Sequence, residues 1–87
     1  MPKIPNWSVT EQKNVSDVTG LRGTVYEWQH DNTGEKVTIE YDREVEGAEF
    51  YLVSFPSGQG ETAGNTLDHA HKIATDFMKR YHAGVDF

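Results

Sequence analysis

The residues of this sequence best suited to hold a metal ion or to move a proton are four histidines, His30, His69, His71 and His82. His69 and His71 lie two residues apart, in the segment with the clearest helical periodicity. On a helix, residues two apart project about 200° from each other, whereas two ligands of one ion need a spacing of four. We therefore expect His71 at the edge of the apolar side of the helix, His69 on its wet side, and no metal site.

Other patterns that signal catalysis are missing from the sequence. No serine lies in a nucleophile elbow, and no pair of carboxylates is placed for a dry cleft. The Ser-Gly-Gln-Gly run at residues 57–60 lacks the Gly-Lys-Ser/Thr ending of a phosphate-binding loop, so it predicts a flexible connector. We expect no catalytic residue and no bound cofactor, and a protein that is not an enzyme.

Charge and length narrow the class of protein further. The chain has 87 residues, no cysteine, and 14 acidic against 8 basic residues, for a formal net charge of −6. A single domain of this size without disulfides must use its hydrophobic core fully. The acidic balance argues against non-specific binding to nucleic acids or anionic membranes, which needs clustered Lys and Arg. Five acids crowd residues 40–49 and predict a solvated turn: Glu40, Asp42, Glu44, Glu46 and Glu49.

No apolar run approaches the roughly 20 residues that span a bilayer, so we expect no membrane insertion. The first five residues are not followed by the apolar stretch of a secretion signal. The expected location is the cytoplasm.

A helix is predicted near the end of the chain, between Asn65 and Gly84. Its apolar residues recur at steps of three and four, which places them within roughly 100° of arc. Asn65 with Asp68 resembles a capping box at the start, and Gly84 suits the position after the last turn. His82 in the last turn suits the helix dipole. The predicted buried side consists of Leu67, Ala70, Ala74, Phe77, Met78 and Tyr81.

Three strands are predicted before the helix. Residues 24–30 alternate, with Tyr26 and Trp28 on one face and Val25, Glu27 and Gln29 on the other. An Asp-Asn-Thr-Gly turn, in which Gly34 can take a positive φ, leads to residues 35–42. That strand buries Val37, Ile39 and Tyr41 and turns Thr38, Glu40 and Asp42 to water.

The third strand, residues 49–55, is apolar on both sides, with Phe50 and Leu52 on one and Tyr51, Val53 and Phe55 on the other. One side can meet the helix, and the other needs a second cover, for which the N-terminal segment with Trp7 is the spare apolar material. If that cover is absent, the side with Tyr51 marks a partner surface.

These elements predict an α+β fold, in the order β-β-β-α, with a three-stranded and possibly four-stranded antiparallel sheet packed against one C-terminal helix. Residues 1–22 are expected to be an irregular segment, ordered in part through Trp7, with a possible short strand at residues 7–10. Residues 23–87 form the single domain. The strand order stays open, because a meander puts the second strand in the centre whereas apolarity favours the third.

The chain resembles a group of small haloarchaeal proteins of unknown function. The resemblance rests on the Pro5-Asn6-Trp7 opening, the strand-turn-strand of residues 25–37, and the helix at residues 74–81. It implies a cytoplasmic protein of a salt-loaded cell, which suits the acidity, because 1 M salt screens carboxylate repulsion beyond about 3 Å. Some members of the group add a Cys-rich tail, which this chain lacks.

The leading functional hypothesis is a non-enzymatic interaction or regulatory module. It binds a protein partner, or itself, through the aromatic sheet face or a free edge strand. The alternative is a DNA- or RNA-binding domain that uses the sheet, with Tyr26, Trp28 and Tyr51 available for stacking on bases. The candidate partner-binding residues are Tyr26, Trp28, Tyr51, Val53 and Phe55.

Overall fold

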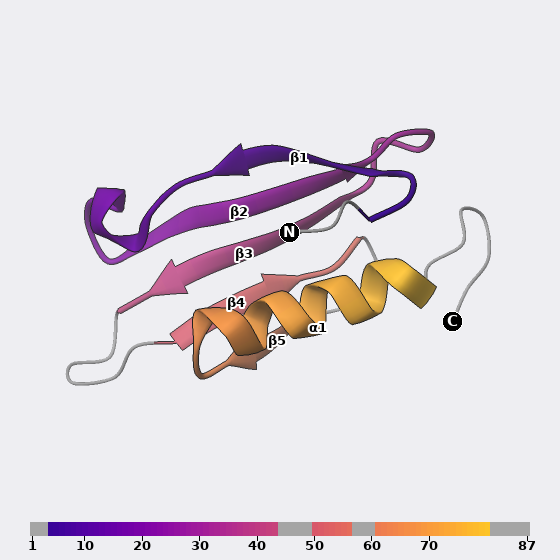
Figure 1. The fold of residues 1–87 in the computed structure, drawn as a ribbon. Helices are drawn as coiled ribbons and strands as arrows, with labels where there is room; N and C mark the ends of the chain where they lie inside the picture. The colour runs from indigo at the N-terminus through magenta and orange to yellow at the C-terminus, as the bar shows by residue number, and fades with distance from the viewer. Residues whose placement is uncertain (1–3, 44–49, 57–60, 81–87) are drawn as a thin grey trace.

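A computed structural model of the protein describes residues 4–43, 50–56 and 61–80; for residues 61 and 62 it describes the backbone alone. The described part consists of one antiparallel sheet and one helix lying against it (Figure 1). The elements, in chain order, are β1 (Trp7–Gln12), the 3-10 helix η1 (Val15–Asp17), β2 (Arg22–His30), β3 (Lys36–Asp42), β4 (Phe50–Ser54), β5 (Glu61–Gly64) and α1 (Leu67–Arg80).

The sheet has five strands in the order β1-β2-β3-β4-β5, and each pair is antiparallel. The predicted α+β class with a C-terminal helix is confirmed, whereas the predicted strand number is too low. The short strand predicted at residues 7–10 is present and runs to Gln12, and β5 was not predicted at all. The order is that of a meander, so the second predicted strand, β3, is central.

Two tight turns depend on a left-handed backbone residue. Asn6 has φ 69°, and the N–H of Trp7 donates to the carbonyl of Ile4 at 3.1 Å. Pro5 and Asn6 therefore form a type II turn, in which proline suits the first central position and asparagine tolerates the second. In the β2–β3 hairpin, Gly34 has the predicted positive φ, 76°. Both turns match the residue types that the sequence places there.

The register of the ladders decides which side chains share a face, because residues opposite each other point to the same side of a sheet. Trp7 lies opposite His30, Trp28 opposite Val37, and Ile39 opposite Val53. These side chains point to the side of α1, which we call the helix-side face. They build the core together with residues from the helix, and its buried members are Ile4, Trp7, Val18, Val25, Trp28, Val37, Ile39, Tyr41, Val53, Ala70, Ala74, Phe77 and Met78.

Val25 departs from the predicted alternation. The β2–β3 register shifts between Thr24 and Tyr26, so Val25 is the extra residue of a β-bulge. It is fully buried in the core, although strict alternation placed it with Glu27 on the face opposite Tyr26 and Trp28. A bulge depends on the pairing of two strands, so one strand's own pattern cannot reveal it.

Asp42 was predicted to face water, and this is wrong. Its side chain is only 2% exposed, and its Oδ2 lies 3.0 Å from Nη2 and 3.1 Å from Nε of Arg22. Arg22 is also its partner in the β2–β3 register. A buried carboxylate needs charged and hydrogen-bonding partners, and the cross-strand arginine supplies them.

The start of α1 differs from the prediction in its cap. The Oγ1 of Thr66 accepts a hydrogen bond from the N–H of His69 at 3.1 Å, and the carbonyl of Thr66 accepts from the N–H of Ala70. Thr66 is therefore the N-cap, not Asn65. A Cβ on Gly64 would lie 3.0 Å from the backbone nitrogen of Ala70, so the glycine allows the helix to start close to β5. The predicted contributions of Tyr81, His82 and Gly84 lie outside the described residues.

Helix α1 packs against β3, β4 and β5, and Figure 1 shows it in front of β4 and β5, with β1 and β2 at the opposite margin of the sheet. The rings of Phe55 and Phe77 are stacked with centroids 4.6 Å apart. Trp7 was the cover expected on the Tyr51, Val53 and Phe55 side of the third strand. That side is instead the helix-side face on which α1 packs. Trp7 lies on the same face as part of β1, and Phe50 and Leu52 are half-buried on the opposite face.

Candidate functional site

His30, the last residue of β2, has a structural role. Its ring is buried, and its Nδ1 accepts hydrogen bonds from the backbone N–H groups of Asn32 and Thr33 at 3.2 and 3.3 Å. The edge of the ring meets Trp7, with centroids 5.0 Å apart. The imidazole therefore closes the hairpin turn and fixes Trp7, and its Nδ1 is not available to a metal.

A polar hollow of about 240 Å³ lies beside this turn, lined by Ser8, Thr10, Gln29, His30, Asp31 and Gly34. Serine, histidine and aspartate are the residue types of a hydrolytic triad, but their bonding is different. The Ser8 hydroxyl donates directly to Oδ1 of Asp31 at 2.6 Å, and the Nδ1 of His30 is occupied by backbone donors. A triad needs the serine on the imidazole and the carboxylate on Nδ1–H, so this hollow has no activated nucleophile.

His69 and His71 diverge as predicted: His69 is exposed and His71 is half-buried on the sheet side of α1. His30 lines the polar hollow, whereas His71 contacts Tyr26 and Trp28. Among the described residues, no group of three His, Cys, Asp or Glu side chains could hold a metal ion.

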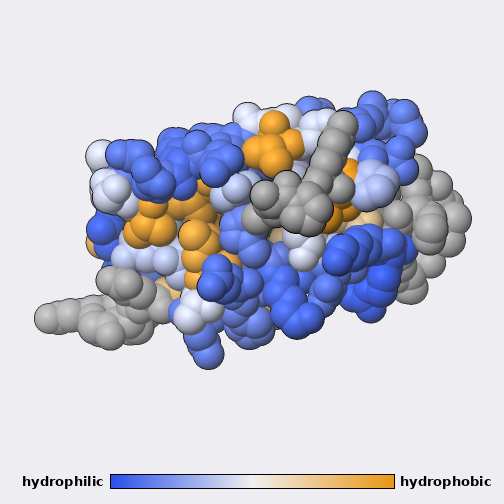
Figure 2. Space-filling view, in the orientation of Figure 1, coloured by the Kyte–Doolittle hydropathy of each residue, from blue (hydrophilic) through white to orange (hydrophobic). Residues whose placement is uncertain are grey.

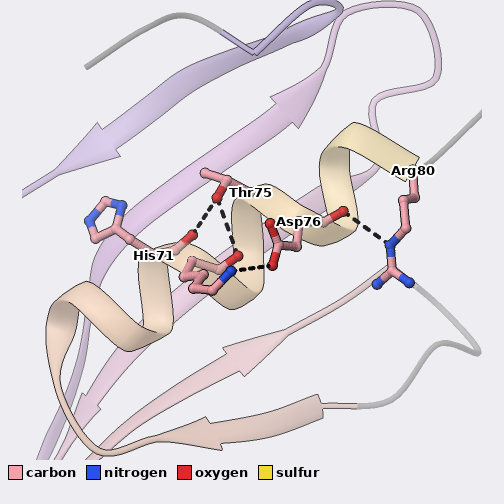
Figure 3. A network of polar contacts seen from close by, with 5 residues as sticks. His71, Thr75, Asp76 and Arg80 are labelled. Carbon is pink, nitrogen blue, oxygen red and sulfur yellow. Dashed lines mark hydrogen bonds and ion pairs between the residues drawn. The ribbon is translucent and has the colours of Figure 1, made fainter.

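The environment of His71 is the most unusual among the described side chains. Its ring lies nearly perpendicular to the rings of Tyr26 and Trp28, with centroids 4.3 and 5.5 Å away. Its Nδ1 is buried and has no hydrogen-bond partner among the described residues. Burial lowers the pKa of His71 below its ordinary value of 6.5, and the nearby Asp68 carboxylate raises it in part. Figure 3 shows His71 one turn before Thr75, whose Oγ1 donates to the His71 carbonyl.

The five predicted partner-binding residues all lie on the helix-side face, but they differ in exposure. Trp28 is 2% exposed and Val53 is fully buried, so neither side chain reaches the surface. Tyr51 and Phe55 are half-buried against Tyr41 and Phe77. Tyr26 is also half-buried; it stacks on Trp28 at 4.8 Å and lies on β2, beyond the strands on which α1 packs.

One helix is too narrow to cover this face. Five strands about 4.8 Å apart span roughly 19 Å, whereas a helix with its side chains is about 10 Å wide. Helix α1 packs over β3 to β5, but Trp7 on β1 and Trp28 on β2 are also buried, at 1% and 2% exposed. Val9, opposite Trp28, is 50% exposed on this face. Figure 2 shows apolar residues at the surface above and to the left of the position that α1 has in Figure 1. We call the helix-side surface made by Val9, Tyr26 and His71 the β1–β2 platform. The sequence did not indicate Val9 as a surface residue of this kind, because the apolar residues of segment 1–22 follow no sustained spacing.

The edge strand β1 is poorly suited to pairing with another strand. The Asn6 carbonyl accepts from Asp31, so alternation turns the backbone groups of Val9 outward. A bulge between Val9 and Glu11 interrupts that alternation, and Glu11 forms an ion pair with Lys13 at 3.3 Å. Bulges and charged side chains on an edge strand hinder its pairing with a strand of another molecule.

The opposite, open face of the sheet carries charged side chains on β2 and β3 and the half-buried Phe50 and Leu52 on β4. Glu27 is held there by Lys36 at 3.8 Å and by the Thr10 hydroxyl at 2.6 Å. Register also places Glu40 on this face. The aromatic residues proposed for base stacking, Tyr26, Trp28 and Tyr51, lie on the other side.

Compared with known proteins, the chain matches no family model, no curated protein and no solved structure. No helix in the described part of the chain has both the length and the apolarity required to cross a bilayer. The class defined by the described residues is a small α+β domain, with one five-stranded antiparallel sheet and a helix over half of one face.

Proposed function

We propose that this protein is a non-enzymatic interaction module that binds a protein partner on the β1–β2 platform. The observation that carries the proposal is the position of α1 over β3 to β5, which leaves Val9 half exposed on the same face as the core. Tyr26 lies on the same face and is half-buried, and its ring stacks on the buried ring of Trp28. Half-buried aromatic and aliphatic side chains that border a core are typical of interface hot spots.

The platform supports this function better than the edge strand does. An added strand needs a regular row of outward backbone groups, which the bulge in β1 interrupts. A surface that binds a partner through side-chain contacts needs instead a rigid apolar support beneath its exposed residues. Trp28 supplies that support, because its ring is buried and contacts the rings of both Tyr26 and His71.

Nucleic-acid binding through the sheet has less support. The open face offers Glu27 and Glu40 rather than clustered bases, and its charge repels phosphate. Trp28, the largest aromatic residue proposed for stacking, is buried. For the compartment we propose the cytoplasm, on the grounds of the sequence alone.

Site-specific photo-crosslinking tests the proposed surface. The photoreactive amino acid p-benzoylphenylalanine replaces Val9 in the full chain, which is then irradiated in a lysate of the cells that produce it, at native salt. We expect a discrete covalent adduct, either with another protein or with a second copy of the chain.

The matched control is the same replacement at Leu21, which is 59% exposed. Leu21 directly precedes β2 and is seven residues before Trp28, about 23 Å away at 3.3 Å per residue. It therefore reports non-specific capture by an exposed apolar site. Equal adducts at both positions, or none at position 9, would contradict the proposal.

A further inference from the structure

We infer that the polar hollow beside the β2–β3 turn binds a guanidinium group, carried either by a small molecule or by an arginine side chain. This site is separate from the β1–β2 platform, so it does not depend on the proposed function. Its volume is about 240 Å³, and its lining residues come from β1, β2 and the turn that follows β2. The ladder places Ser8 opposite Gln29, on the face of the sheet away from α1.

The backbone N–H groups of the turn are engaged inside the protein. The N–H of Asp31 donates to the Asn6 carbonyl at 2.8 Å, and the N–H of Gly34 donates to the His30 carbonyl at 3.0 Å. The N–H groups of residues 32 and 33 both donate to the His30 Nδ1. Backbone anion sites are built from N–H groups that point at the ligand. The turn therefore offers nothing of that kind to a phosphate or a carboxylate.

The side chains of the hollow also direct their donors at protein acceptors. The Ser8 hydroxyl donates to Oδ1 of Asp31, and the Thr10 hydroxyl donates to Oε2 of Glu27, both at 2.6 Å. The Nε2 of Gln29 donates to a backbone carbonyl of the turn at 3.3 Å. Apart from the second hydrogen of this amide, these side chains have only acceptor capacity left. A ligand that fits them must donate hydrogen bonds.

The charge of the hollow indicates that this donor is a cation. In the described part of the chain, Oδ2 of Asp31 and Oε1 of Gln29 have no hydrogen-bond partner, and no basic side chain pairs with Asp31. Lys36 lies opposite Gln29 in the β2–β3 ladder, but its ammonium is 3.8 Å from a carboxylate oxygen of Glu27, which offsets its charge. The Asp31 carboxylate is thus the charge that a ligand meets.

A guanidinium group satisfies this set of acceptors better than an ammonium group does. It is planar, presents five N–H donors in a fixed fork, and forms paired hydrogen bonds with a carboxylate. One edge of the group can bond Asp31 while another N–H reaches the amide oxygen of Gln29 across the hollow. An ammonium group is a compact, strongly hydrated point charge, and it loses more hydration for the same contacts.

A titration followed by two-dimensional ¹H–¹⁵N NMR tests the site in the full chain. Ethylguanidinium chloride is added at low ionic strength, and ethylammonium chloride is the matched control with the same charge and a similar stem. We expect saturable shifts of the amides of Ser8, Gln29, Asp31 and Gly34, with a dissociation constant on the order of millimolar for so small a ligand. Ethylammonium should bind several-fold more weakly.

Two substitutions that remove one negative charge each form a matched pair. Asp31→Asn keeps an acceptor for the Ser8 hydroxyl but removes the carboxylate, and it should weaken binding about tenfold or more, as the loss of a charged hydrogen bond does. Asp17→Asn removes an exposed charge from η1, which follows the other end of β1, and should leave the affinity unchanged. Gln29→Leu is a second variant of the hollow and should weaken binding several-fold. The same spectra report whether each variant is folded.

The outcomes separate the site, the ligand class and the ligand source. Shifts that grow linearly without saturation, or equal losses in Asp31→Asn and Asp17→Asn, would overturn the site. Equal affinities for ethylguanidinium and ethylammonium would overturn the assignment to guanidinium. A third titration uses the tripeptide Gly-Arg-Gly with both ends blocked. Saturable shifts at the same four amides would assign the site to an arginine of a protein chain, whereas binding of ethylguanidinium alone would assign it to a small molecule.

Discussion

The ring of His71 lies edge to face against the ring of Tyr26, with centroids 4.3 Å apart and an interplanar angle of 80°. This contact joins α1 to β2, the strand next to the three on which the helix packs. It brings a titratable group into an aromatic setting where its Nδ1 is buried without a described partner. A hydrogen-bond donor created at that atom would be poorly satisfied.

The first prediction concerns pH. Because burial lowers the pKa of folded His71, both folded and unfolded states are neutral above pH 6.5 and the histidine costs no stability there. As the pH falls below 6.5, the unfolded chain takes up the proton first, so the free energy of unfolding decreases until the folded histidine is also protonated. His71→Phe keeps a ring in place and should reduce this decrease. Urea unfolding of the wild-type protein and the variant between pH 7.5 and 5 measures the decrease in the free energy of unfolding. An identical pH dependence of the two proteins would show that His71 does not contribute to this decrease.

The N-cap of α1 gives a second prediction. Thr66→Ala removes the acceptor of the His69 N–H and should lower the free energy of unfolding by about 1 kcal/mol, within a usual range of roughly 0.5 to 2 kcal/mol. Asn65→Ala is the matched control and should change it by much less, since surface substitutions away from such features stay within about 0.5 kcal/mol. Chemical denaturation decides between them, and a larger loss for Asn65→Ala would restore the cap expected from sequence.

The third prediction tests the turn before β1. Asn6 has φ 69°, a region that is costly for most residues and free for glycine. Asn6→Ala should destabilise the protein by about 1 kcal/mol, whereas Asn6→Gly should leave the stability within a few tenths of a kcal/mol. Thermal unfolding followed by circular dichroism measures both variants. Equal losses would mean that the Asn6 side chain, not its backbone angle, matters.

The fourth prediction concerns the contact between the helix and β4. The stacked rings of Phe55 and Phe77 should be coupled by about 0.5 to 1.5 kcal/mol in a double-mutant cycle. Phe55→Leu and Phe77→Leu, singly and together, keep most of the apolar volume. Additive losses would contradict a direct contact and would place Phe55 outside the interface with α1.

Several parts of the fold were predictable because they depend on neighbours in the chain. The alternation of Val37, Ile39 and Tyr41 specified β3, and the turn residues before it specified a hairpin with Gly34 at positive φ. The three- and four-residue spacing of Ala70, Ala74, Phe77 and Met78 specified a helix with one buried side. The same periodicity separated His69 from His71 and excluded a shared ion. These patterns have periods of 2 and 3.6 residues, and each can be read within one element.

Other features were beyond the sequence, because they depend on which elements meet. The bulge that buries Val25 arises from the pairing of β2 with β3, and the burial of Asp42 depends on Arg22 across the same ladder. The four residues of β5 have too few side chains to show a pattern and become a strand by pairing with β4.

The sequence by itself determined the three strands β2, β3 and β4, the hairpin, the amphipathic helix and the acidic net charge, since local backbone preferences and side-chain periodicity are carried by consecutive residues. The tertiary structure alone decided that Val53 is buried, that Val9 stays half exposed, and that His71 meets Tyr26. The physical reason is the position of α1: a helix about 10 Å wide covers only part of a five-stranded sheet, and which part it covers follows from packing between residues distant in the chain.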